Sequence, residues 1–493
     1  MNFSLPQRQS KLGLIVLFAN SVFGFLKAMW FIVIIFFIRA KQAETFWAIG
    51  IILMLFLGFA IYSYLKYHAF TFYFDEQHNE FVVQHGIINK TKTVIQLHKI
   101  QQVNLKQTII HQLVNVYQVN IDSAGSEEKE AIINAVSKEI AMALKSKLLD
   151  NEKLEITVDP IEHNEEKETL INIDLTSLLK IGITSNYAKS IGLLLTFFFT
   201  IYENLSQAGA DDYVDGSNVK DFFKNNTEVY SILLAIVFLF SIIFIINIIR
   251  TVVKYFGFKI AKQKGSLNLS YGLLTTQNTI LKPEKVQIVK ITRNFFQKKL
   301  KILEVKIKQT SSEKTKNDKS TIEIPGCNEL ERDQILQLLF DEMPIKGEKL
   351  NPNIRKLLFS IFTLIIVPLA AYFIVGNLVS NIVFEYKSVA VVYTIFILIG
   401  LLFGFKNYNL FINNQHIIMQ SGAWDVDNEI IKIEKIQAIT TSQLFWHKSL
   451  NIGSLTIHTA GGNVSFQLGK FDKINQYVNL WLYQIEKNDN NWN

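Results

Sequence analysis

Long apolar segments alternate with polar regions along this chain, and they come in three closely spaced pairs. The six apolar segments fall at roughly residues 15–38, 46–65, 187–204, 230–250, 357–380 and 388–405. A helix needs about 20 apolar residues to cross the hydrocarbon core of a bilayer. The pattern therefore predicts an integral membrane protein with six transmembrane helices in three pairs, each pair followed by a polar region.

Short runs in the polar regions alternate apolar and polar residues, as half-buried strands do. In the first region, the runs 70–74 and 81–85 flank a polar turn at 75–80 and predict a hairpin, and a further strand is expected over 93–97. Each region closes with a helical pattern, at roughly 127–148, 329–341 and 470–486. One unit is then six or seven short antiparallel strands and one amphipathic helix. A small barrel or sandwich plugged by the helix satisfies that inventory.

This alternation divides the chain into membrane pairs, β-rich domains and one linker. The expected helix pairs are residues 12–66, 187–251 and 346–405. The expected domains are residues 67–150, 252–345 and 406–488, and the linker is 151–186.

One motif recurs in all three polar regions at identical spacing. A glycine followed by two apolar residues precedes, by thirteen positions, a lysine, an aliphatic residue and a glutamine. The signature residues are Gly86, Lys99 and Gln101, then Gly272, Lys285 and Gln287, then Gly422, Lys435 and Gln437. Matching offsets in three copies indicate one repeated unit. The glycine is expected to supply a turn or bulge conformation that other residues resist.

The order of helix pair, strand hairpin, signature and terminal helix resembles the bacterial pleckstrin-homology (PH)-like membrane proteins of the multi-domain YdbT type. The resemblance implies a PH-like fold, with two nearly orthogonal antiparallel sheets forming a partly open barrel capped by a C-terminal helix. It implies no activity. It also identifies residues 174–185 as a lead-in to a new helix pair, expected to lie at the membrane interface. The middle copy departs from the pattern, because it carries a polar insertion at 311–320.

Charge predicts the orientation of the chain in the membrane. Net charge is +7, and Lys and Arg flank the apolar pairs on the side of the polar regions, with Arg250 and Lys254 as examples. The loop between the third and fourth segments is acidic. Because cytoplasmic loops carry the excess of Lys and Arg, we expect a multi-pass protein of the cell membrane with both termini and all three domains in the cytoplasm. The lone cysteine, Cys327, excludes an internal disulfide and fits an ordinary thiol in a reducing compartment.

Positive charge is densest in the middle domain. Its candidate contacts for anionic lipid are Lys282, Lys285, Lys290, Arg293, Lys298, Lys299 and Lys301. A basic face beside an anionic leaflet is attracted to it, so specific headgroup binding, general membrane docking and solvated charge all stay open. The three signature lysines also have two interpretations. They bind headgroup phosphate, or they occupy the solvent face of a strand while the neighbouring aliphatic residue faces the core.

The sequence favours a binding role over an enzymatic one. It contains no phosphate loop, dinucleotide-binding glycine pattern, serine elbow or zinc-protease motif, so no catalytic residue, cofactor or metal site is expected. We therefore expect a non-enzymatic scaffold that binds protein, peptide or anionic lipid at the membrane surface. The expected partners are membrane lipids and either a second protein or another copy of this chain. Nucleic acid is not expected as a partner. The alternative is a component of a transport or export system with regulatory PH-like domains. That alternative requires a polar cavity lined by residues such as Asn20, Lys27 and Asn247.

Overall fold

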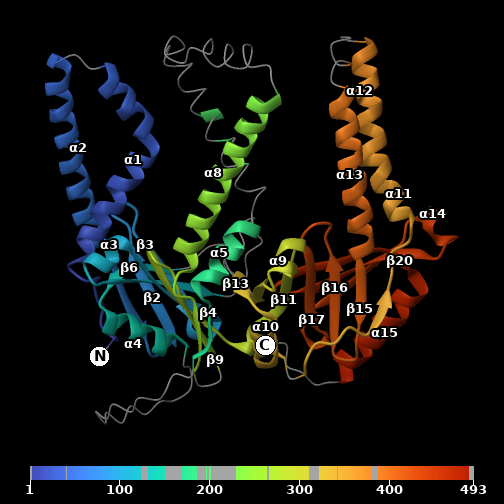
Figure 1. Cartoon of the computed structure of the whole chain (residues 1–493). Helices are drawn as coiled ribbons and strands as arrows, with labels where there is room; N and C mark the ends of the chain where they lie inside the picture. The colour runs from blue at the N-terminus through green and yellow to red at the C-terminus, as the bar shows by residue number, and fades with distance from the viewer. Residues whose placement is uncertain are drawn as a thin grey trace. The chain divides into compact units, whose positions relative to one another are not determined.

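A computed structural model shows two compact units, Met1–Leu281 and Lys282–Asn493, which are described separately (Figure 1). The structure describes residues 3–39, 42–123, 131–149, 169–185, 192, 196, 199–200, 229–263, 266–309, 321–340, 342–378, 384 and 387–487.

Both units contain long apolar helices. The first unit has α1 (Gly13–Arg39), α2 (Gln42–Ala69) and α8 (Val229–Tyr255). Ring contacts of Phe18 with Phe56 and of Phe25 with Phe59 join α1 to α2. Among the residues searched, three stretches are long and apolar enough to cross a membrane, namely Gly50–Ala69, Arg355–Leu378 and Lys387–Asn407. The predicted span 187–204 lies almost wholly outside the described residues.

The first helix of the pair in the second unit contains a π-helical turn. This helix runs as α11 (Arg355–Ile361), a π-helical turn η3 (Phe362–Ile366) and α12 (Val367–Leu378), and the second helix is α13 (Lys387–Asn407). Pro368 has no N–H to donate to the carbonyl of Leu364, four residues earlier. The hydroxyl of Tyr393 donates to that carbonyl instead, at 2.8 Å, so α13 supplies the hydrogen bond that the proline removes.

The first β-rich repeat builds two sheets and one covering helix. The strands β1 (Thr71–Asp75), β2 (Glu80–His85) and β3 (Thr91–Gln96) form an antiparallel meander, which confirms the predicted hairpin. The 3-10 turn η1 (Leu97–Lys99) leads into the second sheet. Its elements are β4 (Ile100–Thr108), α3 (Ile109–Leu113), β5 (Tyr117–Ser123), β6 (Ala131–Val136) and α4 (Lys138–Leu149).

The helix predicted over 127–148 needs correction, because residues Ala131–Val136 form strand β6 and the helix begins at Lys138. Ala131, Ile133 and Ala135 are buried while Ile132 is exposed. This two-residue period matches a strand, and Ile132 and Ile133 pair with β5.

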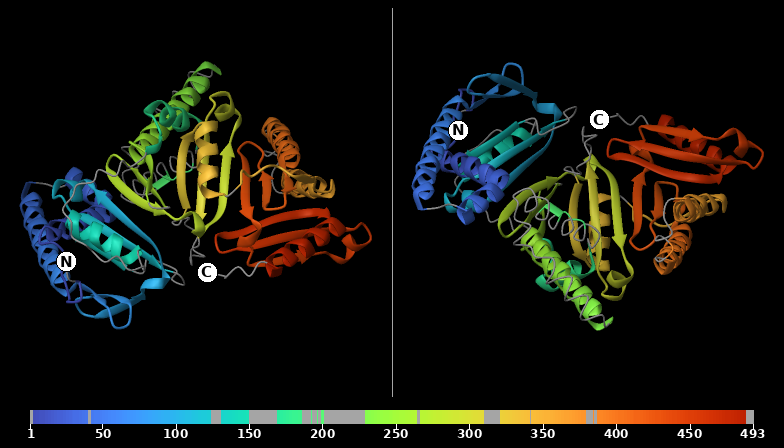
Figure 2. Two further views of the ribbon diagram at one scale, coloured as in Figure 1. Left: turned by 90° about the horizontal axis from the view of Figure 1, so that it is seen from below. Right: turned by 90° about the horizontal axis from the view of Figure 1, so that it is seen from above.

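The other two repeats use the same element order. In the second repeat the elements are β8 (Lys259–Gln263), β9 (Ser266–Tyr271), β10 (Thr275–Leu281), η2 (Pro283–Lys285), β11 (Val286–Arg293), α9 (Phe295–Lys299), β12 (Leu303–Gln309), β13 (Thr321–Cys327) and α10 (Glu329–Leu339). In the third they are β15 (Asn409–Ile412), β16 (His416–Ser421), β17 (Val426–Lys432), η5 (Ile433–Lys435), β18 (Ala438–Ser442), α14 (Phe445–Lys448), β19 (Ile452–Thr459), β20 (Gly462–Lys470) and α15 (Phe471–Lys487). Figure 2 shows α4, α10 and α15 each lying along strands of its own repeat.

A short segment ahead of each helix pair joins the first sheet of its repeat. Gln7 bridges to Phe72 of β1, β7 (Thr169–Asn172) pairs with β8, and β14 (Glu348–Leu350) pairs with β15. Lys473 of α15 holds Glu348 at 3.0 Å. In the second unit, the helix pair α11–α13 therefore lies between β14 and β15, which are paired strands of one sheet.

The sheets continue from one repeat into the next, whereas the sequence predicted three separate small domains, each a partly open barrel. The four sheets have the strand orders β1-β2-β3, β6-β5-β4-β10-β9-β8-β7, β13-β12-β11-β17-β16-β15-β14 and β18-β19-β20. The second sheet of the first repeat is thus continuous with the first sheet of the second repeat, through β4 and β10. The second and third repeats are joined in the same way, through β11 and β17. We call these two contacts the inner joints.

Apolar side chains from the alternating strands fill the domain cores. In the first domain, Phe72, Phe81 and Ile121 are fully buried with Leu144 of α4. In the third domain, Trp481 of α15 lies in a core with strand residues of both of its sheets. The structure thus supports the predicted amphipathic helix as a cover for each end domain.

Candidate membrane-surface site

The signature glycines adopt a backbone conformation that their position requires. Gly86, Gly272 and Gly422 have φ of 110°, 110° and 108°. A Cβ at these positions would come within 2.0 Å of the carbonyl oxygen three residues later. This confirms the turn conformation expected from the sequence, and it makes the glycine a structural requirement rather than a binding residue.

The signature lysines each end the 3-10 turn that connects the two sheets of a repeat, namely η1, η2 and η5. The aliphatic residue that follows each lysine is buried: Ile100, Val286 and Ile436. Gln287 is buried and Gln437 is exposed, and the side chain of Gln101 lies outside the described part of the chain. The aliphatic position of the signature therefore faces the core.

The environments of the three lysines differ. Lys99 is exposed, whereas Lys285 and Lys435 are half-buried. Burial, and secondarily the charge of Lys282, hold the pKa of Lys285 below its ordinary value. The three lysines therefore share a backbone position but are not equally exposed to solvent.

The seven candidate lipid contacts do not form one cluster. Lys282 and Lys285 lie at the start of β11, while Lys298, Lys299 and Lys301 follow its other end. The eight residues of β11 span about 26 Å at the usual rise of a strand. The structure therefore separates the predicted face into a pair at one end and a group of three at the other.

The two remaining members of the predicted set are paired with acids. Lys290 Nζ lies 2.7 Å from Asp427 and 3.8 Å from Glu429, both on β17. Arg293 lies 2.6 Å from Glu329, and hydrogen bonding by Arg293 lowers the pKa of that carboxyl. Lys290 therefore forms ion pairs across an inner joint, and Arg293 forms an ion pair that links the end of β11 to α10.

The helix α9 presents lysines together with aromatic rings. Its N-terminus is a capping box, in which Asn294 and Gln297 exchange hydrogen bonds of side chain and backbone. Phe295 is 55% exposed and Phe296 is 46% exposed. Lys299 Nζ lies 4.9 Å from the centroid of Phe295. We call Phe295, Phe296, Lys298, Lys299 and Lys301 the α9 face.

The α9 face lies beside the turn that is bonded to the end of the apolar helix α13. Phe296 contacts Trp424 with ring centroids 5.6 Å apart. Trp424 belongs to the signature turn, whose Gly422 carbonyl accepts a hydrogen bond from Asn407, at the end of α13, at 3.0 Å. The signature turn and α9 therefore both lie near the C-terminal end of the apolar helix α13.

The exposed apolar residues of α9 have counterparts in the other repeats, which sequence reasoning missed. Ile109 and Leu113 are exposed on α3, and Phe445 and Trp446 are exposed on α14. The signal available in the sequence was that these apolar residues follow the signature lysine of each repeat by ten to fourteen positions. Aromatic and aliphatic side chains beside lysine are typical of the membrane interface.

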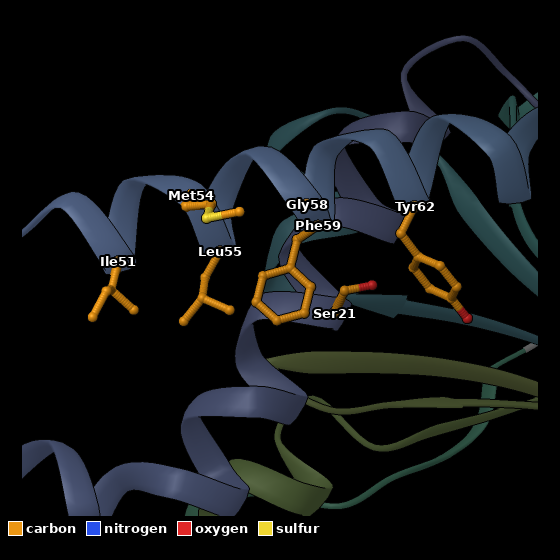
Figure 3. A pocket seen from close by; sticks show the side chains of 7 residues that line it. All are labelled: Ser21, Ile51, Met54, Leu55, Gly58, Phe59 and Tyr62. Carbon is orange, nitrogen blue, oxygen red and sulfur yellow. The ribbon is translucent and has the colours of Figure 1, made fainter. Parts of the chain in front are cut away.

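The polar groups that a transport path would need are scattered in the described helices. Asn20 and Lys27 are exposed on α1, and Asn247 is buried on α8. A groove of about 610 Å³ between α1 and α2 contains none of these three. Figure 3 shows its lining, with Ser21 from α1 and, from α2, Ile51, Met54, Leu55, Gly58, Phe59 and Tyr62. This mainly apolar groove suits a lipid chain.

Two further sequence expectations have a structural counterpart. Cys327 is buried, which raises the pKa of its thiol above the ordinary value. On the lead-in segment, α5 (Leu175–Thr184) buries Leu178 and Ile181 and exposes Leu175, Leu179 and Ile183. Among the residues that the structure describes, no three His, Cys, Asp or Glu side chains gather as metal ligands would.

Comparison with known proteins supplies the family. The sequence model described as the Bacterial PH domain matches at residues 16–152, 217–343 and 362–481. The chain is also similar to the UPF0699 transmembrane protein YdbT of Bacillus subtilis (strain 168), with 22% identity over 273 residues. That similarity covers 53% of this chain and 53% of the relative, so the chain spans about half the length of the curated relative that it matches. No solved structure matches the chain.

The three matches together cover more than half of the chain, and each includes apolar helix and one β-rich repeat. The chain therefore belongs to the bacterial PH domain family, as a membrane protein that contains this domain three times.

Proposed function

We propose that this protein is a non-enzymatic membrane scaffold whose α9 face rests on anionic headgroups of the cytoplasmic leaflet. The observation that carries the proposal is the position of this face, at the foot of α13 and beside the signature turn. In the proposed arrangement six helices in three pairs anchor the chain, and both termini and all three PH domains lie in the cytoplasm.

The chemistry of the α9 face supports lipid contact. Exposed Phe295 and Phe296 offer apolar surface to the acyl boundary, and three lysines offer charge to phosphate. A basic residue near an anionic surface contributes roughly 1 kcal/mol. Lys301 has φ of 56° where the equivalent residues of the other repeats are Asn115 and Asn451, with φ of 50° and 53°. A lysine therefore occupies a backbone position that favours asparagine.

The full-length protein in proteoliposomes tests the proposal. Hydrogen exchange of residues 295–301 is measured in neutral vesicles and in vesicles containing anionic lipid. We expect protection in the anionic vesicles, and we expect the double variant Lys298→Gln/Lys299→Gln to lose it. Two charges at roughly 1 kcal/mol each correspond to about a thirty-fold change.

The chain offers a matched control at the other end of the same strand. The double variant Lys282→Gln/Lys285→Gln removes the same charge about 26 Å away and should leave the protection of α9 unchanged. If both double variants reduce protection equally, or neither does, headgroup contact at the α9 face is rejected.

Orientation has its own test. A reporter fused after Asn493 should give a cytoplasmic signal, because Lys and Arg concentrate on the side of the domains. A signal from the opposite side of the membrane would contradict the proposed orientation.

A further inference from the structure

The two inner joints share one register. Equivalent residues of the first and second repeats are 186 positions apart, as Lys99 and Lys285 are, and those of the second and third are 150 apart, as Lys285 and Lys435 are. In the first joint Gln107 pairs with Thr276. In the second, Arg293 pairs with Val426, which are the equivalent residues. The chain therefore builds the same strand contact twice.

Both joints place directly opposed side chains in contact. In the first, the hydroxyl of Thr276 donates to Oε1 of Gln107 at 3.5 Å. In the second, Thr292 donates to Asp427 at 2.6 Å, and Lys290 reaches Glu429. Such opposed pairs are the units that stabilise an antiparallel contact.

The second joint is also closed by apolar side chains. Ile288 of β11 is buried in the core of the third domain, and Phe296 contacts Trp424 of the adjoining turn. The joint is thus a packed interface as well as a hydrogen-bonded one.

The outer repeats leave the two halves of this joint unpaired. Strand β3 is equivalent to β10 and β17, and β18 is equivalent to β4 and β11. No described residue pairs with the outer side of β3 or of β18. Val94 of β3 is 40% exposed, whereas its equivalent Ile430 is 3% exposed.

The residues around the free edges carry the same apolar pair as the inner joint. Trp446 is equivalent to Phe296, and Ile88 is equivalent to Trp424. Within the chain Phe296 and Trp424 contact each other. At the ends Trp446 is 53% exposed and Ile88 is 99% exposed. Each end of the chain therefore presents one side of an interface that the chain completes twice internally.

We propose that β18 of one copy pairs with β3 of a second copy, antiparallel and in the register of the inner joints. This places Thr440 opposite Thr93 and Ile439 opposite Val94, and it brings Trp446 against Ile88 of the next copy. The contact is head-to-tail, so it leads to a closed ring or to an open filament of copies. It requires no lipid contact at the α9 face and therefore stands apart from the proposed function.

An edge strand has unpaired backbone groups that can pair with a strand of another chain, and lysine on an edge strand commonly prevents this pairing. Strand β3 carries Lys92, which the proposed register places opposite Thr441. Strand β18 runs Ala-Ile-Thr-Thr-Ser and has no charged residue, so Lys92 meets no cation. The outward positions Thr440 and Thr93 are uncharged hydroxyl residues, which suit an opposed pair.

Cross-linking between two tagged copies tests the register. One full-length copy carries Thr440→Cys and the other carries Thr93→Cys, and the two are co-expressed and oxidised in membranes. The native Cys327 is buried, so it does not compete. We expect a disulfide-linked dimer carrying both tags, because directly opposed Cβ atoms lie about 4.5–5.5 Å apart.

The controls separate this contact from other associations. Each cysteine variant expressed alone should give no dimer, since a head-to-tail contact places the two different edges together. Replacing Trp446 by Ala in the first copy should reduce cross-linking several-fold, whereas Phe445→Ala should not. Dimers from a single variant alone, or no dimer from the mixed pair, would overturn the proposal.

Discussion

The two inner joints have one geometry and different chemistry. At the first, β4 meets β10 through Gln107 and Thr276, which are uncharged. At the second, Lys290 lies between Asp427 and Glu429. The register is nevertheless identical. The shared register therefore does not require the charges of the second joint, whereas the signature turn is present at both joints.

The largest effect should come from breaking the shared turn. Gly422→Ala would place a Cβ 1.8 Å from the carbonyl oxygen of Asp425 at φ of 108°. We expect a loss of about 2–4 kcal/mol in the stability of the third domain, with faster hydrogen exchange in both β17 and β11. Gly86→Ala imposes the same strain beside a free edge, so its effect should stay within β2 and β3. If faster hydrogen exchange extended equally far from the mutated turn in both variants, the inner joint would not carry the destabilisation from one repeat to the next.

A smaller effect should come from the charges of the second joint. Lys290→Asn introduces the residue that the first joint has at the equivalent position, Asn104, and removes the cation that lies between Asp427 and Glu429. We expect a loss of roughly 1 kcal/mol, measured by hydrogen exchange of β11, and this loss should shrink as salt rises.

The matched control gives three positions of the second joint the residues of the first. Lys290→Asn/Asp427→Gln/Glu429→Thr removes all three charges together and should restore nearly wild-type exchange. If the triple variant is as unstable as Lys290→Asn, the charges set the register and the comparison of the joints is wrong.

The smallest effect concerns the short helices that follow β4 and β11. His111 of α3 is buried and lies 2.9 Å from the carbonyl oxygen of Asn134, while α9 has Gln297 at the equivalent position. Burial lowers the pKa of His111, so the unfolded chain binds a proton more readily than the folded one. Stability of the first domain should therefore fall as pH drops below about 6.5.

His111→Gln imports the residue of the second repeat and should flatten this dependence. Thermal unfolding of the full chain between pH 7 and pH 5 measures it. The same acid sensitivity in the variant would assign the effect to other groups.

Local patterns predicted what depends on near neighbours. The alternation at 70–85 located a hairpin, because a strand with one buried face shows its period in the sequence. The shared spacing of the three glycines indicated a required turn. The sequence predicts a helix over residues 131–136, because a short apolar run fits the period of a helix as well as that of a strand. Pairing with β5 decided for a strand.

Long-range pairing explains why the basic residues did not form one site. Lys290 and Arg293 are close in sequence to Lys298, but acids on β17 and α10 neutralise them. Charge counting along the chain does not include partners that lie 36 or more residues away. The exposed rings of α9 and α14 were not predicted as a surface feature, since only the fold shows which face is uncovered.

The sequence by itself indicated a membrane protein, the threefold repeat and most of the strands and helices of each repeat, because hydropathy and short-range periodicity express these directly. Only the tertiary structure decided that the repeats share sheets, since backbone pairing between distant strands leaves no mark on composition. The same pairing uses two strand edges at each inner joint, whereas no residue that the structure describes pairs with the outer edge of β3 or of β18.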